Sequence, residues 1–219
     1  MNLTTTRYQK SKKSLTGYLH SVLKKPSSAK IGGAGRHVKK GKLKGAEVYT
    51  LTLTERETCP TSCHHWDDCY GNNMPFAHRI EHGEKLEARL IKEVKEICTK
   101  AKNKGRLVLV RLHVLGDFYS AEYVRLWRRL LVLHQNLYVW GYTHVEEGPI
   151  HNELMLTRFH FPERWAVRWS DTCGTFSANS EELTSDGIVC PEQEGKTQAC
   201  TTCALCWDAP DKNIIFKTH

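Results

Sequence analysis

Segments that favour β-strands alternate with segments that favour α-helices along most of the chain. Strand-forming residues fill 47–53, 106–114, 137–143 and 165–170, and helix-forming segments at 81–104, 121–134 and 150–158 separate them. Each helix brings the chain back to the same end of the sheet before the next strand begins, so consecutive strands run parallel. The pattern predicts an α/β domain with a parallel sheet, to which 187–189 and 213–217 add two short strands.

The second expected strand, RLVLVRLHV at 106–114, becomes polar toward its carboxyl end. From residue 108 on, its even-numbered residues are apolar, whereas Arg111 and His113 share the other face. Polar groups at the carboxyl ends of parallel strands are typical of ligand cavities, and Arg168 in the fourth strand fits the same pattern. Arg111 and Arg168 are candidate contacts for an anionic cofactor, and His113 is a candidate catalytic proton donor. The alternatives are ion pairs with helix carboxylates for the arginines and a hydrogen-bonded interior position for His113.

Asp117 follows this strand directly after a glycine. A carboxylate at the carboxyl end of a strand is a candidate catalytic group. The alternative is that Asp117 caps the helix expected to begin at residue 121.

Positive charge is concentrated at the start of the chain. Residues 1–45 contain 12 Lys or Arg and no Asp or Glu, whereas the whole chain has a net charge of +8. We expect 1–45 to form a flexible basic arm and 46–219 to form the folded domain. A basic arm favours contact with a polyanion such as nucleic acid. A disordered tail that keeps the protein soluble is the alternative.

The composition is that of a globular protein, and the first residues indicate a reducing compartment. No apolar run is long enough to span a membrane, and the first residues lack the apolar stretch of a secretory signal. We expect a cytoplasmic protein without membrane contact. Seven of the nine cysteines lie in two groups, and such grouping in a reducing compartment indicates metal ligands rather than disulfides. Cys98 and Cys173 stand apart and are expected to be small buried residues.

Cys59, Cys63 and Cys69 form the first cysteine group, in the loop after the first strand. Three thiolates can hold three irons of a [4Fe–4S] cluster and leave the fourth iron open to a reacting ligand. His64 or His65 could instead complete a closed zinc site. The C-x3-C-x5-C spacing favours iron–sulfur, because zinc sites usually pair cysteines as C-x2-C or C-x4-C.

Cys190, Cys200, Cys203 and Cys206 form the second cysteine group, in a Cys-rich segment at 187–219. The C-x2-C-x2-C run of the last three is typical of bacterial ferredoxins, and Cys190 can complete four thiolates around a second [4Fe–4S] cluster. Small residues between them leave room for a bulky cluster. Zinc held by four cysteines is the alternative, and the two groups could also share the ligands of one site.

Three segments together resemble the gene-product-88-like proteins of bacteriophages. They are Thr58–Tyr70, with TCP and two further cysteines, Arg111–Ser120, with a histidine and GDF, and Cys190–Trp207, with CPEQ and C-x-x-C-x-x-CW. The resemblance runs in order from about residue 48 to 219. It implies a phage-encoded protein that acts in the cytoplasm of an infected host cell.

A wider resemblance is to radical S-adenosylmethionine enzymes. These have a partial (β/α) barrel, a three-cysteine loop after the first strand, and in many cases further cysteines for an auxiliary cluster. The resemblance implies S-adenosylmethionine as a cofactor, with Gly116 and Asp117 in place of the Gly-Gly-Glu segment that binds its methionyl amine. The chain departs from this pattern in the C-x3-C-x5-C spacing, in Asp for Glu, and in the short domain of 46–219.

Two functions are therefore expected. The first is an iron–sulfur, radical-SAM-like phage enzyme that modifies a nucleotide or nucleic acid. The alternative is a non-enzymatic nucleic-acid-binding protein whose cysteines hold structural zinc or iron–sulfur.

Overall fold

The structure, a computed structural model, describes residues 13–14, 21–32, 37–63, 65–67, 69–74, 77–171, 177–180, 186–209 and 211–217. A parallel sheet of seven strands forms its centre. Its strands are β2 (Glu47–Thr50), β4 (Val108–Leu112), β5 (Leu137–Thr143), β6 (Trp165–Ser170), β7 (Ser177–Ser180), β8 (Ile188–Val189) and β9 (Ile214–Phe216). A separate parallel pair joins β1 (Lys13–Ser14) to β3 (His78–Arg79).

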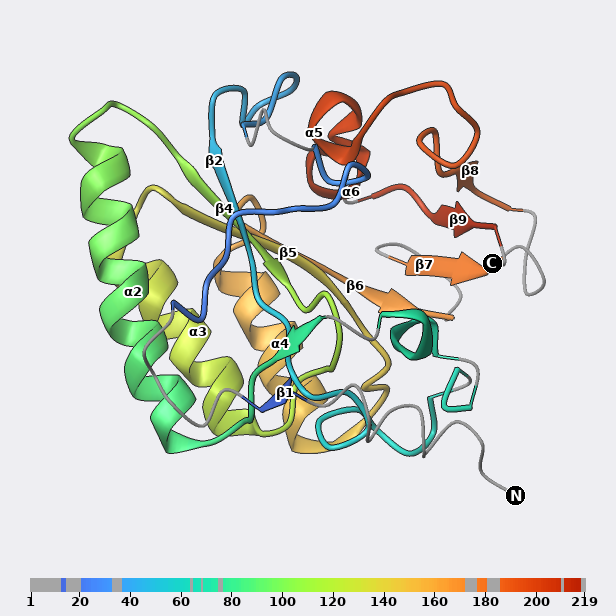
Figure 1. Cartoon of the computed structure of the whole chain (residues 1–219), viewed down its shortest axis with the longest axis horizontal. Helices are drawn as coiled ribbons and strands as arrows, with labels where there is room; N and C mark the ends of the chain where they lie inside the picture. Colours follow the sequence, from blue (N-terminus) through green and yellow to red (C-terminus); the bar gives the residue numbers. More distant parts are fainter. Residues whose placement is uncertain are drawn as a thin grey trace.

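The strands of the large sheet follow the order β2-β4-β5-β6-β7-β9-β8. From β2 to β7 each strand lies beside the one that precedes it in this sheet. Right-handed crossovers that always step in the same direction leave their helices on one face. Accordingly α2 (Glu84–Lys102), α3 (Ala121–Leu133) and α4 (Gly148–His160) lie side by side (Figure 1). The predicted parallel α/β domain is confirmed, and its described sheet is open, with β2 and β8 at the edges.

Most elements begin and end within a few residues of their predicted bounds. Strands β5 and β6 match them, and α3 begins after Ser120, whose Oγ accepts a hydrogen bond from the Tyr123 amide at 3.1 Å. Strand β7 was not predicted, because its sequence SANS contains no strong strand former. It forms because β6 and β9 pair with it on either side.

The two faces of the sheet pack into two hydrophobic cores. In β4, Val108, Val110 and Leu112 belong to the core under the three helices, whereas Leu109 belongs to the core on the opposite face. The predicted alternation of this strand is therefore confirmed. Cys98 of α2 is 1% exposed within the first core, as expected, while Cys173 lies outside the described residues.

Two segments from opposite ends of the chain cover the face without long helices. The first comprises residues 31–32 and 37–46, which bury Ile31, Val38 and Leu43, and the second is the Cys-rich segment. In this second core the rings of Trp140 and Trp207 lie 4.9 Å apart. The two segments also bond to each other, because the Lys39 amide donates to the Thr201 carbonyl at 2.8 Å.

The prediction of a flexible arm over 1–45 is wrong for residues 21–32 and 37–45. Val22 and Leu23 are 2% and 3% exposed, and both main-chain amides donate to the carboxylate of Glu93 on α2. The apolar residues scattered among the lysines are enough to anchor this part of the chain. Residues 1–12, 15–20 and 33–36 lie outside the described part of the chain.

The C-x2-C-x2-C run folds as two single helical turns, α5 (Cys200–Cys203) and α6 (Leu205–Asp208). Ala204 joins them in a left-handed conformation with φ 67°. Gly41 contacts α6 so closely that a Cβ there would lie 1.5 Å from an Asp208 carboxylate oxygen. Among the described helices, none combines the length and the apolar character needed to cross a bilayer.

Candidate metal centre

The first cysteine group lies in the loop that follows β2, beyond the carboxyl edge of the sheet. The three cysteines of this group lie close together. Negative charge on Cys63 or Cys69 would raise the pKa of Cys59. Main-chain amides contact two of the sulfurs, that of Arg56 on Cys59 and that of Gly71 on Cys69. Hydrogen bonds of this kind stabilise thiolate ligands of iron–sulfur clusters. Burial nevertheless raises the pKa of Cys59 to about 12, which keeps the thiol neutral until a cation replaces its proton.

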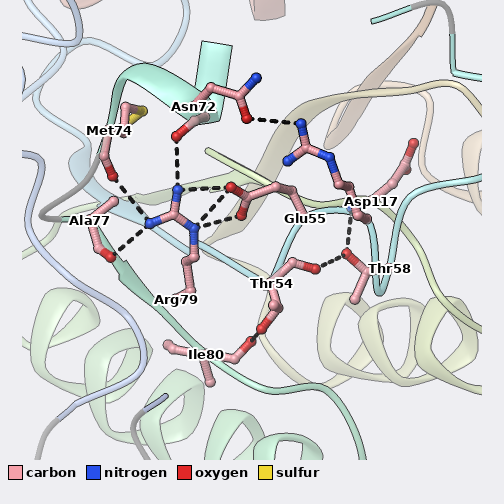
Figure 2. A network of polar contacts seen from close by, with 11 residues as sticks. Thr54, Glu55, Thr58, Asn72, Met74, Ala77, Arg79, Ile80 and Asp117 are labelled. Carbon is pink, nitrogen blue, oxygen red and sulfur yellow. Dashed lines mark hydrogen bonds and ion pairs between the residues drawn. The ribbon is translucent and has the colours of Figure 1, made fainter. Parts of the chain in front are cut away.

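A buried ion pair between Glu55 and Arg79 supports this loop (Figure 2). The two side chains are 1% and 0% exposed, and Arg79 Nε donates to both carboxylate oxygens at 2.9 and 2.7 Å. Its remaining donors bind the carbonyls of Gly71, Met74 and Ala77 at 2.9–3.1 Å. The pair thereby fixes the short helix η2 (Tyr70–Asn73), which begins directly after Cys69. Sequence reasoning missed these two residues, because a buried pair 24 positions apart leaves no local pattern.

Arg56 holds the middle of the same loop. Its Nη2 donates to Asn72 Oδ1 at 2.8 Å and its Nε to the carbonyl of Trp66 at 3.1 Å. Burial raises the pKa of Cys69, and the charge of this guanidinium acts against that rise.

His144 reaches the first cysteine group from the end of β5. Its Nε2 lies 3.0 Å from Asp171 Oδ2, and its ring is hydrogen-bonded to the thiol of Cys63. Burial opposes a charge on this ring, but Asp171 and Cys63 together raise the pKa of His144 to about 10. A carboxylate that fixes a histidine beside a cysteine is a common arrangement around protein-bound metals. His65, one of the two histidines considered as a ligand, lies 3.9 Å from the same Asp171 oxygen, and His64 lies outside the described residues.

Asp117 is 3% exposed and binds main-chain groups. Its Oδ1 accepts the Phe118 amide at 2.7 Å and its Oδ2 the His144 amide at 2.8 Å. Burial raises the pKa of Asp117, although these hydrogen bonds act against that rise. Asp117 therefore positions His144 beside Cys63 rather than capping α3, which Ser120 does. It also contributes to raising the pKa of Cys59, which places it next to the first group.

The backbone conformation and close neighbours explain why residue 116 is a glycine. Its φ is 84°, and a Cβ would lie 2.6 Å from Thr58 Oγ1 and 2.7 Å from Leu53 Cβ. Glycine is needed here for the close approach of the two loops, so the cofactor contact expected of Gly116 stays a prediction.

His113 does not share the cavity expected for it. Strand β4 ends at Leu112, so the alternation that placed His113 beside Arg111 stops one residue earlier. Its Nε2 lies 3.0 Å from the Tyr123 hydroxyl, and its ring packs edge-on against Phe118 in the helix-side core. Burial lowers the pKa of His113 to about 3 and keeps it neutral. His113 thus has the hydrogen-bonded interior position of the alternative, and its catalytic role stays a prediction.

The second cysteine group surrounds one cavity of about 10 Å³ on the face without long helices. Cys190, Cys200, Cys203 and Cys206 all line it. Burial raises the pKa values of Cys200, to about 12, and of Cys206. Glu192 also lines the cavity and pairs with Lys30 of the N-terminal segment at 3.4 Å.

Arg168 anchors the Cys-rich segment. Its guanidinium donates to the carbonyls of Cys206 at 3.1 Å, Ala209 at 2.7 Å and Lys212 at 2.7 Å. The side chain is buried and these carbonyls use its donors. The partners of Arg168 are main-chain carbonyls rather than the helix carboxylate of the alternative, and its cofactor contact stays a prediction.

Arg111 lies between the two cysteine groups. Burial lowers the pKa of its guanidinium, but Tyr70, which follows Cys69, and Tyr142, Cys200 and Cys206 raise it above the ordinary value. Its carbon Cζ lies 5.6 Å from the centre of the Tyr142 ring. The anion contact predicted for Arg111 stays a prediction.

The donors at both groups fit a metal–thiolate centre by their chemistry. Within the described ranges, no three Cys, His, Asp or Glu side chains already converge in the geometry of a metal site. Four thiols around one cavity suit either a [4Fe–4S] cluster or zinc, and three thiols with His144 nearby suit a cluster with a variable fourth ligand.

A family model described as Gene product 88 matches residues 21–158, which is more than half of the chain. The chain belongs to the gene product 88 family. The Gene 88 protein of Mycobacterium phage L5 is 25% identical over 134 residues, which cover 50% of this chain and 54% of the relative. The Gene 88 protein of Mycobacterium phage D29 is 24% identical over 135 residues, covering 50% and 55%. The chain thus spans about half the length of these curated relatives, and no solved structure matches it.

Membership of this family confirms the predicted resemblance to phage proteins. The matched range begins at residue 21, where the chain becomes anchored to Glu93, and it includes the first cysteine group, Arg111 and His144. The second cysteine group lies beyond its end at residue 158. None of these matches points to radical S-adenosylmethionine enzymes, so that relation rests on the cysteine loop and the sheet alone.

Proposed function

We propose that this member of the gene product 88 family is an iron–sulfur protein of the infected cell's cytoplasm. Cys190, Cys200, Cys203 and Cys206 would hold one [4Fe–4S] cluster, and the first cysteine group would hold a second. The observation that carries the proposal is that four cysteines, one of them from a separate turn, line a single cavity. Their contiguous C-x2-C-x2-C run favours a cluster over zinc.

The proposal assigns the reactive role to the first cysteine group. Its three thiols lie beyond the carboxyl edge of a parallel sheet, where α/β proteins place their ligand sites. A [4Fe–4S] cluster held by three cysteines would supply the open iron and the electron for reductive cleavage of S-adenosylmethionine. The order of the strands and the position of the long helices on one face of the sheet, as in (β/α) barrels, support the hypothesis of a radical-SAM-like enzyme.

The residues around this group would orient and enclose such a cofactor. Asp171 fixes the His144 ring, Asp117 fixes the His144 backbone, and Arg79 fixes the turn after Cys69. With these residues held in place, little reorganisation is needed when a ligand arrives.

Anaerobic reconstitution with iron and sulfide tests the proposal. We expect a brown protein with about eight irons per chain, falling to about four in Cys63→Ala and in Cys203→Ala. Cys98→Ala, in the helix-side core, is the matched control and should keep the full iron content. Calorimetry should then detect S-adenosylmethionine binding to the wild type and not to Cys63→Ala. A colourless protein that takes up stoichiometric zinc and no iron would overturn the proposal.

A basic cavity supports nucleic acid as a partner in the second candidate function. His37, Lys39, Lys44 and Arg106 line a cavity of about 260 Å³ beside the start of β2 and β4. Lysines and arginine at this edge suit phosphate groups. The structured residues 37–45 would then contribute to the contact first assigned to the arm 1–45.

Filter binding to duplex and single-stranded DNA at several salt concentrations tests this second candidate. Replacing Lys39 and Lys44 by Gln should reduce the slope of log affinity against log salt by about 1–2. Replacing the exposed Lys85 and Lys92 of α2 instead provides a control with the same charge change. Equal slopes in both double variants would remove the cavity from the nucleic-acid interface.

A further inference from the structure

Tyr142 places a hydroxyl on the sulfur of a candidate ligand. Its Oη donates to Cys206 Sγ at 3.0 Å, and this contact helps to lower the pKa of Cys206 against the effect of burial. Tyr142 projects from β5 into the face that carries the Cys-rich segment, whereas Cys206 belongs to α6. The contact therefore joins the rigid sheet to the cavity of the second cysteine group.

Arg111 adds a positive charge at the same place. It lies on β4 next to β5, close enough to interact electrostatically with Cys200 and Cys206. Its Nε is buried and has no hydrogen-bond partner within the described part of the chain. Arg111 as a whole is half-buried, and a cationic group enclosed in this way normally finds an anion or a set of acceptors.

Two fully buried arginines show what a structural arginine looks like in this fold. Arg79 binds Glu55 and three carbonyls, and Arg168 binds carbonyls of the Cys-rich segment. Arg111 differs, because its surroundings are the phenol groups of Tyr70 and Tyr142 and the sulfurs of the second group. The missing counter-charge is therefore to be sought at those sulfurs.

We propose that Tyr142 and Arg111 raise the reduction potential of a [4Fe–4S] cluster held by Cys190, Cys200, Cys203 and Cys206. The inference rests on the proposed function. One-electron reduction adds one negative charge to the cluster and its thiolates, and no bond to the protein forms or breaks. A hydroxyl donor and a guanidinium both stabilise the added charge. The second cysteine group is then a redox centre, and zinc, which has no redox chemistry in proteins, would leave these two side chains without that role.

A redox titration of the reconstituted full-length protein tests the inference. Working in the Cys63→Ala background confines the signal to the second group, with dithionite as the one-electron donor and electron paramagnetic resonance as the readout. Tyr142→Phe removes only the hydroxyl. We expect it to favour the oxidised form about tenfold at a given potential, since a hydrogen bond to a charged group contributes about 1.5 kcal/mol, and this equals a fall of about 59 mV for one electron.

Two further variants separate charge from packing. Arg111→Met should also lower the midpoint potential, and Arg111→Lys should restore most of it, because lysine retains the charge. Tyr138→Phe is the matched control, since Tyr138 lies on the same face of β5 four residues nearer its start, and it should leave the potential unchanged.

The outcomes distinguish this inference from the proposed function. A wild-type protein that assembles no cluster at the second group contradicts the proposed function itself. A cluster that assembles in every variant with the same midpoint potential overturns the roles of Tyr142 and Arg111 and leaves the iron–sulfur proposal standing.

Discussion

Replacing Glu93 by Gln should release the N-terminal segment from the domain. The Glu93 carboxylate is 5% exposed and accepts four groups. The Val22 and Leu23 amides donate to it at 3.0 Å, the Ser21 hydroxyl at 2.6 Å and Arg89 Nε at 2.7 Å. Glutamine keeps the shape of the side chain but removes the charge and turns an NH2 group toward donors.

The expected loss is about 1.5–3 kcal/mol, the contribution of hydrogen bonds to one charged group. Glu93→Ala should cost more, because it leaves two buried amides without an acceptor, each at about 1–3 kcal/mol. Against a typical total stability of about 5–15 kcal/mol, either loss is easily measured.

Urea denaturation measures the loss, and hydrogen exchange locates it. The unfolding midpoint of Glu93→Gln should fall by about 1 M for a urea dependence of about 2 kcal/mol per molar. The amides of Val22 and Leu23 should exchange faster than those of β5. Glu96→Gln on the exposed side of α2 is the matched control and should change neither quantity.

The pH dependence of the wild type supplies a second check. Burial tends to raise the pKa of Glu93, but its bonds to Leu23, Ser21, Arg89 and Val22 lower it below 4.5. Its contribution is therefore complete above pH 4.5 and is lost as the pH falls through the lower folded-state value. Should Glu93→Gln unfold at the wild-type midpoint with unchanged exchange at Val22, the anchoring of residues 21–23 by this carboxylate would be refuted.

Three further predictions concern the loop, the interior histidine and the N-terminal segment. Glu55→Gln should destabilise the protein by about 3–5 kcal/mol in urea, because it removes the charged partner of the buried Arg79, whereas Asp67→Asn at an exposed position of the same loop should not. His113 should stay neutral in nuclear magnetic resonance spectra down to about pH 4, because burial lowers its pKa from 6.5 to about 3. Each pH unit below 6.5 in that range should then cost about 1.4 kcal/mol of stability, since only the unfolded chain takes up the proton, and a ring that titrates near 6.5 would show that it is not buried. Removing residues 1–12, which precede β1, should leave the unfolding midpoint and iron content unchanged. Removing 1–45 should lower both, because residues 37–45 cover the Cys-rich segment, and equal iron content in both truncations would contradict that covering role.

The sequence by itself determined the parallel α/β architecture. Strand and helix periodicity are local properties, so β5, β6 and α3 follow directly from the residues within them. The alternation in β4 likewise predicted two covered faces. The grouping of seven cysteines also needed no structure, because the spacing of ligands within one loop is a property of the sequence.

Only the tertiary structure decided which distant residues meet. The pairs Glu55–Arg79 and His144–Asp171, and the contact of Tyr142 with Cys206, join segments 24 to 64 positions apart. Such contacts depend on how crossovers stack the strands, and no local pattern encodes that stacking.

The tertiary structure also decided where β4 ends and which residues cover the face of the sheet opposite the long helices. His113 turned into the core because β4 ends at Leu112, one residue before the alternation would have placed it beside Arg111. The sequence of residues 21–32 and 37–45 predicts a basic arm, because charged residues dominate their composition. They fold because a few apolar side chains, among them Val38 and Leu43, find a sheet face that would otherwise remain exposed to water, and burying that face offsets the entropy of ordering the segment.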